Sequence, residues 1–264
     1  MSELVLFEQQ GDVAWLTMNR PEVRNALSRE HVAAIRDAIE RATEVEGIRV
    51  IVLAGSDPVF CAGADVNQYR QVSDPDQVRD DGARLMDLLD YMMRCELPIV
   101  ARVQGAAFGG AMGLTCASDV VVAAEGTRFS LSEARLGIVP AVISHAVVTA
   151  LGPRHARQLM LRSEPFSAEE ALAIGLAQDV VPEQELDAAV TQMANQLRKG
   201  APGALTEIKR LIHTLSLGEL SRDEEREMIL AIAAERRTSN EGQEGLNAFL
   251  EKRPPAWDRA RMSN

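Results

Sequence analysis

Glu133 is the residue whose type and surroundings best suit proton transfer. It lies in the mainly apolar segment FSLSEARLGIVPAVIS. Apolar surroundings raise the pKa of a carboxyl group, which suits it to general acid–base catalysis. A second interpretation is that Glu133 is a solvated residue at the start of a helix, after Ser130 or Ser132. The local sequence leaves both interpretations open.

Two glycine-containing loops, residues 60–69 (FCAGADVNQY) and 104–114 (QGAAFGGAMGL), follow apolar runs that predict buried strands. Glycines after a strand let the backbone approach a ligand closely and leave N–H groups exposed. Two such groups aimed at one oxygen would form an oxyanion hole. Neither loop matches the dinucleotide-binding or Walker pattern, and on spacing alone both could be close-packed turns.

The hydrophobic pattern predicts the elements that position these segments. Residues 4–7 and 13–18 predict a β-hairpin around a Gly-Asp turn. Ser28 is a helix cap, because apolar residues then recur at helical spacing. Further strands are predicted at 50–54, 99–103 and 120–124, and a helix at 78–94. Alternating strands and helices indicate right-handed crossovers and a mostly parallel sheet.

After about Pro140 the pattern becomes helical, and only residues 177–181 still predict a strand. Helices are predicted around residues 156–161, 168–174, 185–197, 202–215, 223–236 and 244–251. We expect the tail to fray after Trp257. The chain is therefore expected to combine a βα core with a helical C-terminal part.

Composition disfavours several classes of function. The chain has 28 Lys and Arg against 39 Asp and Glu, a net charge of −11, which disfavours nucleic-acid and anionic-membrane binding. Three cysteines without a CxxC pair are typical of buried thiols in a reducing cytoplasm. Neither a signal peptide nor a membrane-spanning run is evident, so we expect a cytoplasmic protein. No metal, flavin or nicotinamide motif is found, so no metal or cofactor is expected.

Five segments, in order, resemble the enoyl-CoA hydratase/isomerase, or crotonase, family: RPEVRNALS, FCAGADV, GAAFGGAMGL, SEARLGIVP and EGLNAFLEKRPPAW. The resemblance covers residues 3–257. It implies an α/β fold, a crotonase-like spiral of ββα units with a helical C-terminal oligomerisation region. Residues 1–200 would form the core with the CoA and acyl sites, and residues 201–264 the oligomerisation region. The implied assembly is a homotrimer or a dimer of trimers.

The resemblance also assigns roles to residues. The N–H groups of Ala64 and Gly110 would hold the thioester oxygen of an acyl-CoA, with Glu133 as the acid–base group. CoA is part of the substrate rather than a cofactor. Phe249 and Lys252 would reach in from a neighbouring subunit. The implied substrate-binding positions are Arg24, Ala62, Asp65, Val66, Gly113, Ala141, His145, Phe249 and Lys252.

Gly113 departs from the pattern of the familiar family hydratases, which carry a first glutamate at this position and a second one at Glu133. The family's 3,2-trans enoyl-CoA isomerases keep only the second. We predict a hydratase, because GAAFGG-x-x-GL and FSLSEARLG-x-x-PAVIS resemble bacterial 3-methylglutaconyl-CoA hydratases, which tend to have glycine there. The related isohexenylglutaconyl-CoA hydratases act on the same glutaconyl core with a longer branch and are a further candidate. The alternatives are an isomerase or other crotonase activity and a non-catalytic, RNA-binding relative.

The acyl pocket is predicted from positions that differ from that branch, namely Gln68, Tyr69, His145 and Ala146. A glutaconyl group carries a second carboxylate, which an arginine can hold by two hydrogen bonds. Arg135, two residues from Glu133, is the first candidate for this contact, and Arg84 is the second. The alternative is that both are surface or scaffold arginines.

Overall fold

The computed structural model describes residues 3–71 and 74–258. Its main sheet has six strands in the order β1-β2-β3-β4-β6-β9. The first pair is antiparallel and all later pairs are parallel, so the predicted hairpin and mostly parallel sheet are confirmed. The strands are β1 (Val5–Gln10), β2 (Val13–Met18), β3 (Val50–Gly55), β4 (Ile99–Val103), β6 (Val120–Ala124) and β9 (Asp179–Val181).

A second, small sheet holds three short strands that the hydrophobic pattern did not predict. They are β5 (Ala106–Phe108), β7 (Arg128–Ser130) and β8 (Phe166–Ser167), in the order β5-β7-β8. The expectation of a single strand after Pro140 is therefore wrong. Strands of two or three residues are too short to show a period of two, and only their pairing in space defines them.

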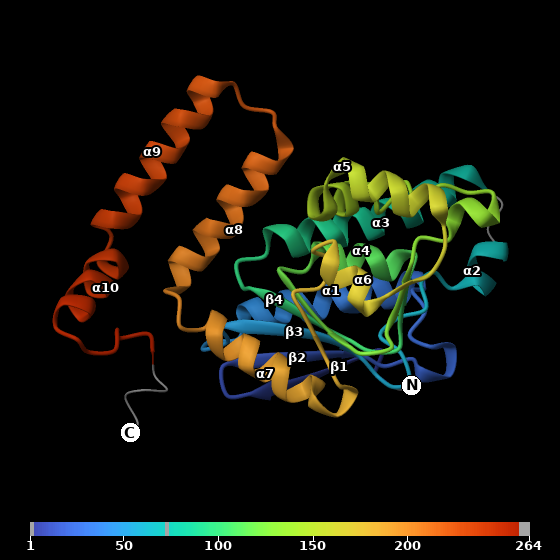
Figure 1. The fold of residues 1–264 in the computed structure, drawn as a ribbon, viewed down its shortest axis with the longest axis horizontal. Coiled ribbons are helices and arrows are strands. Elements are labelled where there is room, and N and C mark those ends of the chain that lie inside the picture. The colour runs from blue at the N-terminus through green and yellow to red at the C-terminus, as the bar shows by residue number, and fades with distance from the viewer. Residues whose placement is uncertain (1–2, 72–73, 259–264) are drawn as a thin grey trace.

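Both faces of the main sheet are covered (Figure 1). On β3, Ile51 and Leu53 join the main core, whereas Val50 and Val52 belong to a second cluster with Leu186 of α7. This burial on both faces explains why β3 reads as a continuous apolar run. The core helices are α1 (Arg29–Glu44), α2 (Val66–Gln71), α3 (Pro75–Arg94), α4 (Gly110–Ala117), α5 (Ser144–Arg162), α6 (Ala168–Ala173) and α7 (Leu186–Leu197). Three 3-10 turns complete this part: η1 (Pro21–Val23), η2 (Glu133–Leu136) and η3 (Glu183–Glu185).

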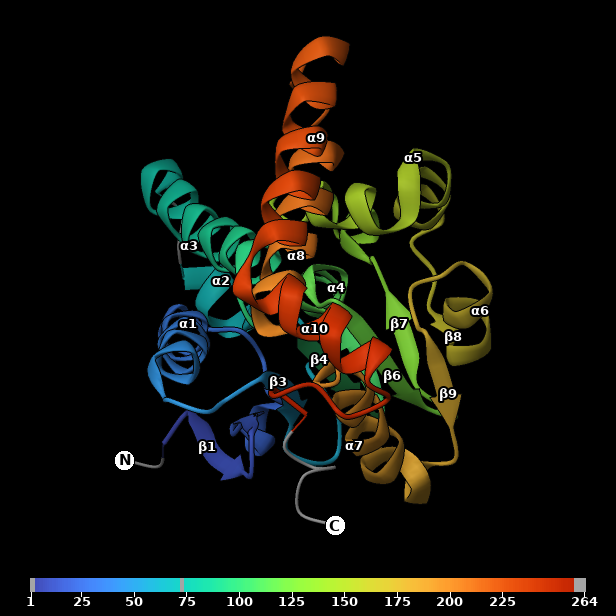
Figure 2. The same cartoon turned by 90° about the vertical axis from the view of Figure 1, so that its left-hand side faces the viewer.

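Three further helices, α8 (Pro202–Leu217), α9 (Arg222–Thr238) and α10 (Asn240–Leu250), extend from the core as an arm (Figures 1 and 2). Lys209 of α8 anchors the arm, since its ammonium lies 2.5 Å from the Asp119 carboxylate and also donates to the carbonyl of Leu97. None of the residues of α9 is buried. Within residues 3–71 and 74–258, the helices lack the length and apolar character needed to cross a membrane. The predicted fraying after Trp257 concerns residues that lie mostly outside the described part.

Candidate active site

The two glycine loops pack directly against each other. Cys61 donates its N–H to the carbonyl of Ala106 at 3.0 Å, and Phe108 donates to the carbonyl of Cys61 at 3.2 Å. Gly63 has φ +96°, and a Cβ there would lie 2.7 Å from the carbonyl oxygen of Phe108. Only glycine fits this close approach. The predicted loops are thus held in one fixed relative position.

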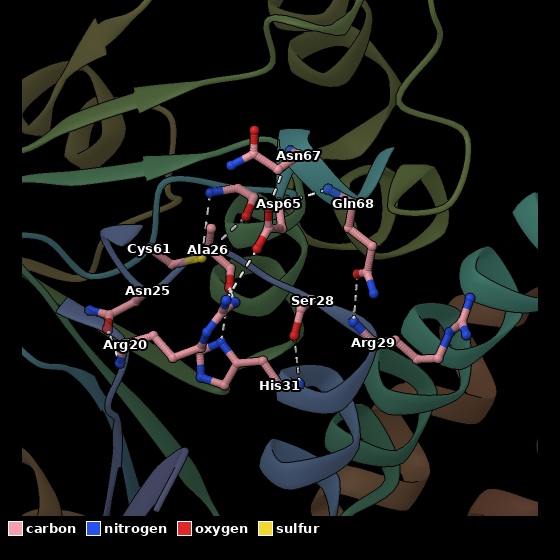
Figure 3. A network of polar contacts seen from close by, with 11 residues as sticks. Arg20, Asn25, Ala26, Ser28, Arg29, His31, Cys61, Asp65, Asn67 and Gln68 are labelled. Carbon is pink, nitrogen blue, oxygen red and sulfur yellow. Dashed lines mark hydrogen bonds and ion pairs between the residues drawn. The ribbon is translucent and has the colours of Figure 1, made fainter. Parts of the chain in front are cut away.

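The first loop is also fastened to the segment before α1 (Figure 3). Leu27 donates its N–H to the carbonyl of Gly63 at 2.8 Å and accepts from the N–H of Asp65 at 3.1 Å. Arg20 donates to the carbonyl of Ala26 at 2.6 Å and pairs with the Asp65 carboxylate at 3.1 Å. These bonds fix the backbone on both sides of Ala64.

Two backbone donors remain without a partner between these fixed points. The N–H groups of Ala64 and Gly110 have no hydrogen-bond acceptor within residues 3–71 and 74–258. Gly110 is the first residue of α4, where helix geometry leaves N–H groups unpaired and adds positive potential. Both residues line one cavity. A developing negative charge on an oxygen in this cavity would meet both donors.

Glu133 is brought to the same place by the small sheet. β7 pairs in parallel with β5, with Ser130 opposite Phe108, and Gly109 donates its N–H to the carbonyl of Ser130 at 2.9 Å. Glu133 follows three residues later as the first residue of η2. A Cβ at Gly109 would lie 3.2 Å from Oε1 of Glu133, so the carboxylate rests against the residue just before Gly110.

The environment of Glu133 suits acid–base chemistry. The residue is half-buried, and its buried Oε2 has no hydrogen-bond partner in the part of the chain that the structure describes. Burial raises the pKa of the Glu133 carboxyl, which its own backbone N–H lowers only in part. The structure agrees with the first of the two interpretations of the sequence, because Glu133 is a half-buried carboxylate in an apolar cavity.

The cavity has a volume of about 240 Å³ and mainly apolar walls. Among the residues assigned from sequence, it is lined by Ala62, Ala64, Val66, Gly110, Glu133 and Ala141. Gln68 and Tyr69, predicted for the acyl pocket, line it as well. These residues come from the two loops, from α2 and from the segment around η2.

Other assigned positions do not line this cavity. Arg24 is exposed, with its carbonyl accepting from the N–H of Ala62. The carboxylate of Asp65 bonds to Arg20 and to the N–H groups of Asn67 and Gln68, so it is engaged within the protein. Its role in the described structure is to begin α2.

Gly113 and His145, two further assigned positions, also lie outside the cavity lining. Gly113 is buried below the cavity, where a Cβ would lie 2.7 Å from Ile143 and 2.9 Å from Leu89. Apolar side chains therefore fill the place of the first glutamate. His145 is exposed on α5 and lies outside the cavity lining. Ala146 is buried and likewise outside the lining.

The two candidate arginines lie in different places, and Arg84 lines the cavity whereas Arg135 does not. Arg135 pairs with Glu164 at 2.8 Å on the surface and does not line the cavity, because the second residue after Glu133 on η2 points away from it. Arg84 of α3 lines the cavity, and its guanidinium has no hydrogen-bond or ion-pair partner among residues 3–71 and 74–258. Its position makes it the cation available to a ligand.

Phe249 lies on α10 and Lys252 just after it, and neither residue lines the cavity of the same chain. In the ribbon, α10 lies far from α2, which contributes to the cavity wall (Figure 1). Phe249 is 81% exposed, which is unusual for an aromatic side chain. A single chain therefore does not bring these two residues to its own site.

One feature of the cavity wall was missed from sequence. The guanidinium of Arg29 on α1 forms a two-pronged ion pair with Asp81 of α3, at 2.6 and 3.0 Å. The backbone N–H of Arg29 donates to Oε1 of Gln68. All three residues line the cavity. Because the pair joins residues far apart in the chain, no local motif signals it.

Comparison with known proteins agrees with this geometry. The model of the enoyl-CoA hydratase/isomerase family matches residues 8–260. The 2,3-dehydroadipyl-CoA hydratase of Escherichia coli is 32% identical over 258 residues, covering 97% of this chain and 98% of that protein. The chain therefore belongs to the enoyl-CoA hydratase/isomerase family.

Solved structures show the same fold over nearly the whole chain. AtuE of Pseudomonas aeruginosa superposes with a TM-score of 0.91 at 33% identity, covering 97% of this chain and 100% of that one. An enoyl-CoA hydratase from Shewanella pealeana gives a TM-score of 0.89 at 36% identity, with 96% of each chain covered. The protein has the crotonase fold and is an enzyme of the enoyl-CoA hydratase type.

Proposed function

We propose that this chain adds water to the double bond of an α,β-unsaturated acyl-CoA, with Glu133 as the acid–base group and Ala64 and Gly110 as the oxyanion hole. The observation that carries the proposal is the buried, unpaired Oε2 of Glu133 in the same cavity as two N–H groups that have no acceptor within residues 3–71 and 74–258. Leaving such groups unpaired costs stability, which is typical of a site that a ligand completes.

The residues divide the reaction as follows. The thioester oxygen accepts hydrogen bonds from the N–H groups of Ala64 and Gly110. Glu133 takes one proton from water while the water oxygen bonds to Cβ, and the electron pair of the double bond moves to the thioester as an enolate. The two donors stabilise this charge more than the neutral carbonyl. Glu133 then gives the proton to Cα, so one water is added and the carboxylate is restored.

The proposed substrate is a 3-substituted glutaconyl-CoA, of the 3-methylglutaconyl or isohexenylglutaconyl type in leucine or acyclic terpene catabolism. Such an acyl group has a second carboxylate, and Arg84 offers a guanidinium at the cavity wall with no partner in the described residues. Arginine binds carboxylates through two parallel hydrogen bonds. The similarity to a hydratase named for 2,3-dehydroadipyl-CoA, also a dicarboxylic acyl group, supports this choice.

A panel of acyl-CoA substrates tests the proposal through loss of the conjugated-enoyl absorbance. We expect a glutaconyl-type thioester to exceed crotonyl-CoA in kcat/KM by 10-fold or more, about 1.4 kcal/mol. Equal kcat/KM values for the two substrates would contradict the glutaconyl assignment and indicate a hydratase of short-chain enoyl-CoA. Absence of any water addition would remove the hydratase proposal.

Double-bond isomerisation is the second candidate, favoured by the packing around Gly113. Leu89 and Ile143 occupy the place of the first glutamate. One carboxylate is enough to move a proton between two carbons of an enoyl thioester. NMR of the product separates the two activities, since hydration gives a 3-hydroxyacyl-CoA and isomerisation a shifted double bond.

We further propose that the chain works as a homotrimer or a dimer of trimers, with Phe249 and Lys252 of one copy reaching the CoA of another. The arm exposes Leu246, Phe249 and Leu250, and such a cluster of large apolar side chains is typical of an interface. Exposed Arg24, beside Ala62 of the cavity, is the proposed contact for a CoA phosphate.

A further inference from the structure

The cavity offers few groups to hold the attacking water besides Glu133. The place of the missing first glutamate is closed, since a Cβ on Gly113 would already be 2.7 Å from Ile143. Water that attacks Cβ gives one proton to Glu133, and its second O–H then needs an acceptor, because an unpaired polar group is costly in an apolar cavity. A second polar side chain on the cavity wall would supply that acceptor and fix the water.

Most polar side chains of the cavity wall are already engaged. Both carboxylate oxygens of Asp81 bond to Arg29, and Oε1 of Gln68 accepts from the N–H of Arg29. The hydroxyl of Ser28 accepts from the N–H of His31 at the start of α1. Arg84 is a donor only and cannot accept a hydrogen bond from water.

Two hydroxyl groups remain on the cavity wall, those of Tyr69 and Ser132, and neither has a hydrogen-bond partner among residues 3–71 and 74–258. Ser132 directly precedes Glu133 on the same turn. Tyr69 belongs to α2, on the other glycine loop, and is 54% exposed at the cavity. A water bound by Glu133 and Tyr69 is held from two sides of the cavity, which fixes its orientation. A water bound by Glu133 and Ser132 is held from one side only.

We propose that Tyr69 is a further catalytic residue, whose hydroxyl oxygen accepts a hydrogen bond from the attacking water while Glu133 takes the other proton of that water. The phenol keeps its own proton throughout, so the balance of the hydration step is unchanged. Partial burial of the ring, followed by the negative charges of Asp81 and Glu133, raises the pKa of Tyr69, which keeps the phenol neutral. This inference rests on the proposed hydratase activity.

The experiment compares two reactions that share Glu133 but differ in their need for water. Hydration of an enoyl-CoA needs the bound water. Exchange of the α-protons of butyryl-CoA for deuterium in D₂O, followed by NMR, needs only the oxyanion hole and Glu133. We expect Tyr69→Phe to lower kcat for hydration about 10- to 100-fold, with KM and the exchange rate within about twofold of wild type.

The matched control is Tyr91→Phe, since the chain has two tyrosines and Tyr91 lies outside the cavity, beneath the guanidinium of Arg36. We expect this variant to keep both rates. Because Tyr69 is more than half exposed, its loss of one hydroxyl should leave the melting temperature almost unchanged.

Four results would overturn the assignment. Hydration by Tyr69→Phe at the wild-type rate would exclude a role of the hydroxyl in catalysis. An equal loss of hydration and exchange would also exclude it, because such a loss indicates a structural role. Selective loss of hydration in Ser132→Ala, with Tyr69→Phe active, would transfer the role to Ser132. A wild type that exchanges α-protons but hydrates no enoyl-CoA would instead overturn the proposed function, and the Tyr69 role with it.

Discussion

The carboxylate of Glu133 rests against the backbone of Gly109, such that a Cβ at residue 109 would lie 3.2 Å from Oε1. Gly109 has φ +52° and ψ −116°, a conformation that other residues rarely adopt. The contact sets the acid–base group beside Gly110, whose N–H is one of the two proposed oxyanion donors. The acid–base group and the charge-stabilising group thus share one rigid junction between two loops.

Replacing Glu133 by Gln should remove the acid–base group while keeping the shape of the site. We expect kcat for hydration to fall roughly 10² to 10⁴-fold, with an unchanged circular dichroism spectrum. The matched control is Glu183→Gln, an exposed glutamate outside the cavity lining, which should keep wild-type activity. A Glu133→Gln variant with wild-type kcat would show that another group moves the proton.

The pH dependence should report the raised pKa of Glu133. As a base, the group must be ionised, so kcat/KM should rise with pH through this pKa and be lost as the pH falls below it. Because burial raises the pKa, the midpoint of the acid limb should lie above the ordinary glutamate value of 4.5. A pH–rate profile measures this midpoint, and an acid limb at or below 4.5 would contradict the assignment.

Arg84 should determine the preference for a second carboxylate. We expect Arg84→Met to lower kcat/KM for a glutaconyl-type thioester about 10-fold or more, about 1.4 kcal/mol, and to leave crotonyl-CoA within about twofold. Arg135→Met is the control, because Arg135 pairs with Glu164 outside the cavity lining. An equal effect of Arg84→Met on both substrates would indicate a general role in the cavity wall.

Gly113 should not tolerate a side chain. A Cβ would press on Ile143 at 2.7 Å and on Leu89 at 2.9 Å, and such overpacking costs about 1–3 kcal/mol. The greater helix propensity of alanine offsets up to about 1 kcal/mol of this. We expect Gly113→Ala to lower the free energy of unfolding, measured by urea denaturation, and Gly113→Glu to gain no activity. A stable, faster Gly113→Glu variant would show that the two-glutamate arrangement can be restored.

The C-terminal arm should be needed for both assembly and CoA binding. Truncation after Gly242 removes most of α10, with Phe249 and Lys252. We expect the truncated chain to sediment as a smaller species and to bind CoA more weakly, because the large apolar side chains of α10 are exposed in a single chain. A wild type that sediments as a fully active monomer would contradict this prediction.

The sequence by itself determined which residues could take part in catalysis. Glu133, the two glycine loops and the empty position at Gly113 are visible as residue types. The long elements were also predictable, since strands such as β3 and helices such as α1 bury enough side chains to show a clear pattern. A pattern of this kind reports burial along one element and says little about partners far away in the chain.

Only the tertiary structure decided how these residues meet. The pairing of β5 with β7 sets Glu133 beside Gly109, yet each strand has only three residues and shows no period. The tertiary structure also decided the places of Arg84 and Arg135, because the direction of a side chain depends on the helix or turn that carries it. Arg135 turns to Glu164 on the surface, whereas Arg84 reaches the cavity from a helix distant in sequence. Contacts between distant segments are set by packing in three dimensions, which a local pattern does not encode.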